Sequence, residues 1–192
     1  MDKLKNAITF AYDAHKGTYR KNSDQPYIFH PVEVLSLASY ITNDEDILCA
    51  AVLHDTVEDT EATIEEIREQ FGDRIADMVS VETEDKRGQV NKKGTWEIRK
   101  QENIDKIKNC NSLGAKIVCL CDKISNLRSF HILYLQHGED MWKIFNMNDP
   151  LMHYWYYNTL KDALVELKDY AIYKEYCFLI DTMFDKYKEK KQ

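Results

Sequence analysis

Residues 46–59 read DILCAAVLHDTVED, an apolar run that ends in a cluster of ionisable side chains. The run predicts a mostly buried helix that begins at Asn43-Asp44 and continues to about Glu58. Charged groups on a buried segment are costly unless they bind a metal ion or one another. Imidazole and carboxylate groups together suit Mn, Fe or Zn. The string therefore favours a functional site; the alternative is a helix end that enters solvent, with Glu58 and Asp59 as surface charges.

The spacing of the four ionisable residues in this string supports a common site. His54 and Glu58 are four residues apart, and so are Asp55 and Asp59. Residues four apart are neighbours on the surface of a helix, so the spacing predicts two adjacent stripes of polar groups. Such crowding at the end of an apolar helix is typical of a metal or catalytic site.

Two other strings each carry one ionisable group in an apolar setting. His30 stands between an apolar tetrapeptide and Pro31, which suits the first position of a second helix. Asp122 directly follows the apolar run 117–121 and is expected on a buried helix, where an unpaired carboxylate is expensive. The alternative interpretations are a capping or packed histidine at position 30, and a salt bridge of Asp122 with Lys123 or Arg128.

The rest of the sequence predicts helices. Six glycines and three prolines make only nine chain-breaking residues among 192, so turns are few. Thr63 with Glu66, Ser112, and Asp149-Pro150 are capping signals that mark helix starts. We expect an all-α fold of roughly nine or ten helices, in a single domain over residues 1–192. The predicted helices cover 2–15, 31–40, 43–58, 63–71, the stretch from 73 to a polar loop at 82–95, then 96–110, 112–133, 150–167 and 171–187.

Composition excludes some classes of function. A net charge of -7 disfavours binding to DNA or RNA, which needs a broad basic face, but allows a small anion held by a local basic cluster. No window approaches the ~20 apolar residues of a membrane span, and the N-terminal residues lack the apolar core of a secretory signal. Five cysteines without a CxxC pair are expected to be reduced thiols of a cytoplasmic protein, with Cys119 and Cys121 in the core.

The combination of His30, His54-Asp55 and Asp122 resembles the H…HD…D pattern of the HD-domain metal-dependent phosphohydrolases. The closer resemblance, over roughly residues 5–130, is to the hydrolase domain of the RelA/SpoT family. Without a synthetase or regulatory domain, the chain is similar to the small alarmone hydrolases, and residues 140–192 are expected to complete the HD domain. The strings that carry the resemblance are AHKG at 14–17, RK at 20–21, PYIFHP at 26–31, AAVLHDTVEDT at 50–60, FG at 71–72 and DKISNLR at 122–128.

This resemblance implies an activity and a cofactor. The activity is Mn²⁺-dependent hydrolysis of the 3′-pyrophosphate of guanosine 3′,5′-bis(diphosphate) and of the pentaphosphate, which gives GDP or GTP and pyrophosphate. The resemblance implies that Glu58 and Asp59 orient or deprotonate the attacking water and assist the leaving group. The residues that it implies as ligands of one Mn²⁺ ion per chain are His30, His54, Asp55 and Asp122.

The resemblance also implies contacts with the nucleotide. Arg20 and Lys21 match an Arg-Lys pair that packs against the purine, and Asn126 matches an asparagine that contacts the nucleoside. Ser129 stands where many relatives have threonine and keeps the hydroxyl group. These four residues are therefore candidate substrate-binding residues.

A basic stretch is the candidate site for the phosphates. Residues 86–100 hold six basic residues and one acid, a local charge of +5 within a chain of net charge -7. Charge-assisted hydrogen bonds to phosphate are among the stronger polar contacts, so the stretch suits a diphosphate or triphosphate. Lys86 and Arg87 are the leading candidates, and the alternative is a solvated loop.

Other functions stay open at this point. An HD nucleotidase or an NADP(H) phosphatase would remove a single phosphate on the same scaffold, and a nucleotide-sensing interaction module would need no catalysis. Such modules usually lose a metal ligand or the acid pair. Here all the candidate ligands and both acids of the pair are present. The expected partner is a small nucleotide, without nucleic acid or membrane. The aromatic string 153–157 predicts a packing face in the core or in a homo-oligomer.

Overall fold

The computed structural model describes residues 2–21, 23–84 and 94–188. These residues form helices and no β-strand, apart from one isolated bridge between Tyr19 and Pro26, which confirms the all-α prediction. The chain forms two compact units, Met1–Asp85 with Cys110–Asp122, and Lys86–Asn109 with Lys123–Gln192. The helices are α1 (Asp2–Ala14), α2 (Phe29–Ala38), α3 (Glu45–Leu53), α4 (Thr56–Asp59), α5 (Ile64–Phe71), α6 (Asp73–Glu82), α7 (Trp96–Asn109), α8 (Leu113–His137), α9 (Pro150–Ala163) and α10 (Ala171–Lys188), with 3-10 turns at Gly138–Ile144 and Val165–Leu167.

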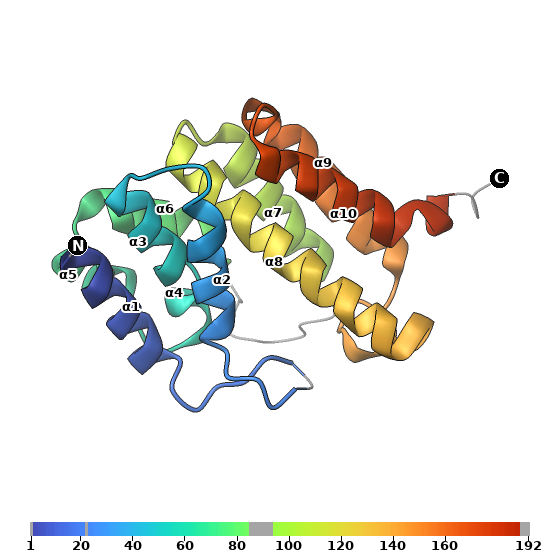
Figure 1. The fold of residues 1–192 in the computed structure, drawn as a ribbon, viewed down its shortest axis with the longest axis horizontal. Helices are drawn as coiled ribbons and strands as arrows, with labels where there is room; N and C mark the ends of the chain where they lie inside the picture. The colour runs from blue at the N-terminus through green and yellow to red at the C-terminus, as the bar shows by residue number, and fades with distance from the viewer. Residues whose placement is uncertain (1, 22, 85–93, 189–192) are drawn as a thin grey trace. The chain divides into compact units, whose positions relative to one another are not determined.

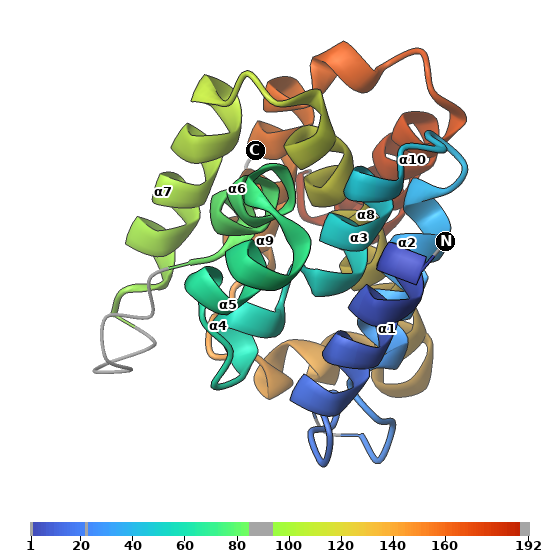
Figure 2. The same ribbon diagram turned by 90° about the vertical axis from the view of Figure 1, so that its left-hand side faces the viewer.

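Helix α3 is the centre of the first unit and packs against α1, α2 and α6 (Figures 1 and 2). Its residues Cys49 to Leu53 are fully buried, as the apolar run in the sequence predicts. Asp44 begins the helix by accepting a 3.1 Å hydrogen bond from the backbone N–H of Asp46. The opposite end of α3, which is fully buried from Cys49 to Leu53, therefore leads directly into His54.

The prediction of one continuous helix to Glu58 is wrong. α3 ends at Leu53, and α4 is a separate turn of helix. Between them the backbone of Asp55 lies at φ -96° and ψ -4°, between the helical and extended regions. The hydroxyl of Thr56 donates a 2.6 Å hydrogen bond to the carbonyl oxygen of Leu53, which satisfies an acceptor that the broken helix leaves open. The spacing of apolar residues in the sequence does not indicate this break.

Helix α2 begins two residues before the predicted start. It starts at Phe29, so His30 lies in the first turn and Pro31 is the third helical residue. Proline is tolerated there because the first N–H groups of a helix have no partner within it. The backbone N–H of His30 donates to the carbonyl oxygen of Tyr27 at 2.9 Å, which fixes the histidine at the start of the helix.

Helix α8 approaches α3 and α6 closely near its start, within the first unit. A Cβ atom at Gly114 would lie 2.5 Å from Sδ of Met78 and 3.0 Å from Cγ1 of Ile47, so only glycine fits without a shift. Further along α8, Cys119 and Cys121 are fully buried free thiols, as predicted. This packed segment brings Asp122 to the first unit's interior.

In the second unit, α9 packs against α7 and against α10. The hydroxyl of Tyr156 donates a 2.8 Å hydrogen bond to Asn103 Oδ1 on α7. The hydroxyl of Tyr176 on α10 donates to the carbonyl oxygen of Tyr157 at 2.8 Å. Tyr156 and Tyr157 are buried, and so is His153, so the aromatic string contributes to the core of this unit, as predicted.

Leu53 offers a direct test of the importance of α3. We expect Leu53→Ala to lower the free energy of unfolding by about 2–5 kcal/mol, because the side chain is fully buried and its loss leaves a cavity. The matched control is Leu135→Ala, whose side chain is 72% exposed, and a change within about 0.5 kcal/mol is expected there. Urea denaturation followed by circular dichroism measures both variants. Equal losses would contradict the central role of α3.

Candidate metal centre

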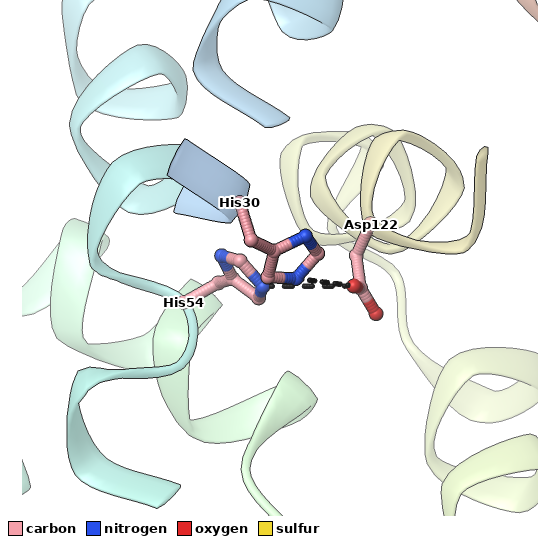
Figure 3. Close-up of side chains that lie close together, drawn as sticks. All are labelled: His30, His54 and Asp122. Carbon is pink, nitrogen blue, oxygen red and sulfur yellow. Dashed lines mark ion pairs between the residues drawn. The ribbon is translucent and has the colours of Figure 1, made fainter. Parts of the chain in front are cut away.

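Four candidate ligands converge inside the first unit. His30 comes from the first turn of α2, His54 and Asp55 from the break after α3, and Asp122 from α8 (Figure 3 shows three of them). The side chains of His30 and His54 are each 1% exposed, that of Asp122 is 7% exposed and that of Asp55 is 17% exposed. The structure thus brings together all four residues that the sequence predicts as ligands.

The distances between the donor atoms are those of a coordination site. His30 Nε2 lies 3.3 Å from Asp55 Oδ2 and 3.1 Å from Asp122 Oδ1. His54 Nε2 lies 3.1 Å and 3.7 Å from the same two oxygens. Ligand atoms about 2.0–2.2 Å from one ion are about 2.8–3.6 Å from their neighbours. The ligand atoms of His30, His54 and Asp122 all lie within 4.8 Å of one another, so one divalent ion could bind these three residues. Asp55 Oδ2 lies beside both histidine nitrogens and is the candidate fourth ligand.

In its neutral form, His54 has the tautomer that metal binding needs. Its Nδ1 lies 2.8 Å from the carbonyl oxygen of Ala51, and because a carbonyl only accepts, Nδ1 is the atom that donates. In the neutral ring Nε2 then carries the lone pair. This Nε2 is buried and makes no hydrogen bond to the described residues, as expected for an atom that binds a cation. The residues therefore fit a divalent metal.

Charge in the cluster is mutually compensated. Burial lowers the pKa of His54, but Asp55 and Asp122 outweigh burial and raise this pKa well above 6.5. Burial raises the pKa of the Asp55 carboxyl, but His54 and His30 outweigh it and hold this pKa well below 3.8. Without a metal, these shifts favour a protonated His54 beside an ionised Asp55. A metal ion would take the place of that proton.

Two acidic residues of α4, Glu58 and Asp59, follow the candidate ligand Asp55 in the chain. The backbone N–H of Asp59 donates to the carbonyl oxygen of Asp55 at 2.9 Å, so the α4 turn keeps these two residues together. Glu58 is half-buried, and its Oε2 accepts a 3.2 Å hydrogen bond from the backbone N–H of Glu84. The broken helix therefore still presents the predicted acid pair one turn after the ligands.

Tyr27 and His15 are site residues that the sequence reasoning missed. The hydroxyl of Tyr27 lies 2.6 Å from Asp55 Oδ2 and 2.9 Å from Asp59 Oδ2. The buried ring of His15 lies against Tyr27, with 4.8 Å between the ring centroids. The signal for Tyr27 was its place three residues before His30 in PYIFHP. For His15 the sequence offered only the short string AHKG.

The candidate substrate-binding residues fall into three groups. Arg20 and Lys21 belong to the first unit, and the Arg20 guanidinium lies 5.7 Å from the centroid of the Tyr27 ring, beside the site. Asn126 and Ser129 are half-buried on α8 in the second unit, so their contact with the nucleotide stays a prediction. Lys86 and Arg87 lie outside the described residues.

Asp122 and Arg128 each have an ionic partner within their own unit. The Arg128 guanidinium pairs with Glu175, at 2.6 Å and 2.8 Å from Oε1. Asp122 instead places Oδ1 at 3.1 Å from His30 Nε2. The buried aspartate therefore belongs to the cluster of candidate ligands.

A family model described as the HD domain matches residues 7–142. The chain belongs to the HD domain family. All four candidate ligands lie within the matched residues, and residues of both compact units are included in the match. HD domain hydrolases are metal-dependent, and the buried group of His30, His54 and Asp122 meets that requirement.

Curated relatives of this HD domain include hydrolases of a guanosine nucleotide. The chain is 36% identical over 132 residues to guanosine-3′,5′-bis(diphosphate) 3′-pyrophosphohydrolase MESH1 of Danio rerio, which covers 67% of this chain and 69% of the relative. It is 40% identical over 126 residues to the MESH1 of Xenopus tropicalis, and this alignment covers 64% of this chain and 66% of the relative. It is 27% identical over 195 residues to a GTP pyrophosphokinase of Myxococcus xanthus. The chain spans only 26%, 23% and 16% of the length of the first three curated relatives that it matches.

Solved structures agree with the HD fold. A metazoan orthologue of SpoT, described as hydrolysing ppGpp with a role in starvation responses, superposes with a TM-score of 0.71 at 25% identity, over 97% of this chain and 96% of that one. The protein lmo0812 of Listeria monocytogenes superposes with a TM-score of 0.70 at 30% identity, over 81% of this chain and 99% of that one. None of the described helices of the HD domain is long and apolar enough to span a membrane.

Proposed function

We propose that this HD domain is a Mn²⁺-dependent hydrolase that removes the 3′-pyrophosphate of guanosine 3′,5′-bis(diphosphate) and of the pentaphosphate. The observation that carries the proposal is the cluster of four candidate ligands in a chain similar to the MESH1 enzymes. The α4 turn, which directly follows the ligand Asp55, carries the carboxylates of Glu58 and Asp59. The products are GDP or GTP and one molecule of intact pyrophosphate.

His30, His54, Asp55 and Asp122 are the residues that would hold the ion. When bound, the ion supplies positive charge that polarises a phosphoryl oxygen and makes water easier to deprotonate. The hydrogen bond from His54 Nδ1 to the Ala51 carbonyl oxygen orients the ring for this task. The low exposure of both histidines keeps bulk water from competing for their nitrogens.

Glu58 and Asp59 are assigned to proton transfer. A water oxygen bonds to the phosphorus attached to ribose O3′, the bond between this phosphorus and O3′ breaks, and O3′ takes up a proton. The proton lost by the water goes to one of the two carboxylates. Their place on α4, one turn after Asp55, supports this assignment.

The basic groups are assigned to the nucleotide. Arg20 and Lys21 lie beside the site on the loop that also carries Tyr27, which supports a role in binding the purine. Lys86 and Arg87 are proposed to bind the phosphates, and Asn126 and Ser129 to bind the nucleoside. We further propose that the chain acts as one HD domain in the cytoplasm, with the small nucleotide as its partner.

A hydrolysis panel tests this function. Metal-free protein is supplied with Mn²⁺ and incubated separately with guanosine 3′,5′-bis(diphosphate), NADPH and GTP, and the products are separated by chromatography. We expect the bis(diphosphate) to have the highest kcat/KM. Faster release of monophosphate from NADPH or GTP would instead identify an HD phosphatase or nucleotidase. No turnover of any substrate would favour a nucleotide-sensing module.

Metal binding should release a proton. Without metal, the neighbouring carboxylates raise the pKa of His54 and favour the protonated ring, whereas a ligand nitrogen must be neutral. Below this raised pKa, Mn²⁺ competes with a proton and binds more weakly as the pH falls. Titration calorimetry at pH 7 in two buffers of different ionisation enthalpy measures the proton release. An observed enthalpy that does not depend on the buffer would contradict the expectation.

A further inference from the structure

The hydroxyl group of Tyr27 joins a candidate metal ligand to a candidate catalytic carboxylate. It lies 2.6 Å from Asp55 Oδ2 and 2.9 Å from Asp59 Oδ2. The hydroxyl has a single proton, which it shares between the two carboxylate oxygens as a three-centre hydrogen bond. Hydrogen bonds to carboxylates are stronger than those between neutral groups. The bridge therefore couples the position of Asp59 to that of Asp55.

The contact with Tyr27 restricts the orientation of the Asp59 side chain. Asp59 is exposed, and it belongs to a helix of only four residues. An exposed side chain on a short turn samples several rotamers, and each restriction costs conformational entropy. The contact with Tyr27 selects the rotamers in which Oδ2 faces the hydroxyl, close to the ligand Asp55.

Tyr27 is itself held from several directions. Its backbone N–H donates to the carbonyl oxygen of Thr18 at 2.9 Å. The ring of His15 lies 4.8 Å away with an interplanar angle of 34°, and the ring of His30 meets it edge-on at 5.8 Å. The Arg20 guanidinium lies 5.7 Å from the ring centroid, within the range of a cation–π contact. A ring held in this way can position another group.

Burial keeps His15 suited to this supporting role. The side chain is 3% exposed, and neither ring nitrogen has a hydrogen-bond partner among the described residues. Burial lowers the pKa of His15, although Asp55 and Asp59 act in the opposite direction. The lowered pKa favours the neutral imidazole, which supplies a flat ring for Tyr27 without adding a charge next to the cluster.

We propose that Tyr27 is a positioning residue that aligns the Asp59 carboxylate for proton transfer. The inference rests on the proposed function and deepens it, because it assigns a role to a side chain that the ligand set and the acid pair do not include. Tyr27 acts through Asp59 and takes no proton from the attacking water.

The first test is Tyr27→Phe, which keeps the ring and removes the hydroxyl. We expect kcat to fall about 10- to 100-fold, the range for loss of a group that orients a site residue. KM should change by less than about twofold, and Mn²⁺ should remain at one ion per chain. Tyr19→Phe is the matched control, because Tyr19 lies on the same loop and is 59% exposed. Its kcat should equal that of the unmodified protein.

A double-mutant cycle separates positioning from an independent role. If Tyr27 acts through Asp59, adding Tyr27→Phe to Asp59→Asn should lower kcat by less than about twofold further. The proposal is overturned if the two losses multiply, if Tyr27→Phe alone has full activity, or if Tyr27→Phe loses the metal.

A measurement without turnover distinguishes this inference from the function on which it rests. Carboxyl ¹³C resonances of the Mg²⁺-loaded protein are recorded, and the resonance of Asp59 is assigned with Asp59→Asn. Tyr27→Phe should shift this resonance, whereas Tyr19→Phe should not. If no substrate is hydrolysed, the proposed function is wrong, yet the resonance still reports the bridge. An unchanged Asp59 resonance in Tyr27→Phe overturns the role of Tyr27.

Discussion

Asp122→Ala is expected to abolish metal binding and to lower kcat/KM by at least about a thousandfold. Asp122 Oδ1 lies 3.1 Å from His30 Nε2 and 3.7 Å from His54 Nε2, so its removal opens the side of the cluster formed by α8. A metal ion contributes several kcal/mol of transition-state stabilisation, and about 4 kcal/mol corresponds to a thousandfold in rate. Elemental analysis of the purified variant measures the metal, and the pyrophosphate assay measures the rate.

The control for this change is Asp181→Ala. Asp181 is exposed on α10 and pairs at 3.1 Å with Lys188, a surface contact of little energetic value. Its metal content and activity should equal those of the unmodified protein. Circular dichroism checks that both variants keep their helices. If Asp122→Ala retained one ion per chain and full activity, Asp122 would not be a ligand.

Glu58→Gln and Asp59→Asn are expected to keep the metal and lose the rate. Each change keeps the size of the side chain and removes its capacity to take a proton at neutral pH. General acid–base catalysis typically contributes about 10²- to 10⁴-fold, so kcat should fall by that amount in the more important of the two variants. Single-turnover kinetics with saturating Mn²⁺ measures the loss in the chemical step.

Glu61→Gln is the matched control for the acid pair. Glu61 is exposed and follows the α4 turn closely in the sequence, outside the pair itself. It should retain full activity. If the double variant Glu58→Gln with Asp59→Asn kept its activity, the two carboxylates would have no part in proton transfer. If it lost the metal instead, they would act on metal affinity.

The helices were predictable where local signals decide them. Thr63 and Glu66 form the expected capping box, and Asp149 accepts the expected hydrogen bond from the N–H of Leu151. The break after Leu53 was not predictable, because it depends on a hydroxyl-to-carbonyl bond from Thr56 and on the backbone angles of Asp55. Neither of these features changes the spacing of apolar residues in the sequence.

The candidate ligands of the site were predictable from the sequence, but the hydrogen bonds that connect them to other residues were not. His30, His54 and Asp122 are rare polar groups in apolar strings, and that contrast is visible in the sequence. The hydroxyl of Tyr27 contacts Asp55 and Asp59, which lie 28 and 32 residues later in the chain. A tyrosine among apolar residues looks like a core residue, so only the folded arrangement reveals its hydroxyl contacts.

Product analysis of guanosine 3′,5′-bis(diphosphate) hydrolysis by the full chain tests the central claim most directly. Metal-free protein is assayed with and without added Mn²⁺, and GDP, pyrophosphate and orthophosphate are quantified by ³¹P NMR. The proposed function predicts GDP and intact pyrophosphate in equal amounts, formed only when Mn²⁺ is present. Orthophosphate as the initial product, or the same rate in the presence of a chelator, would contradict it.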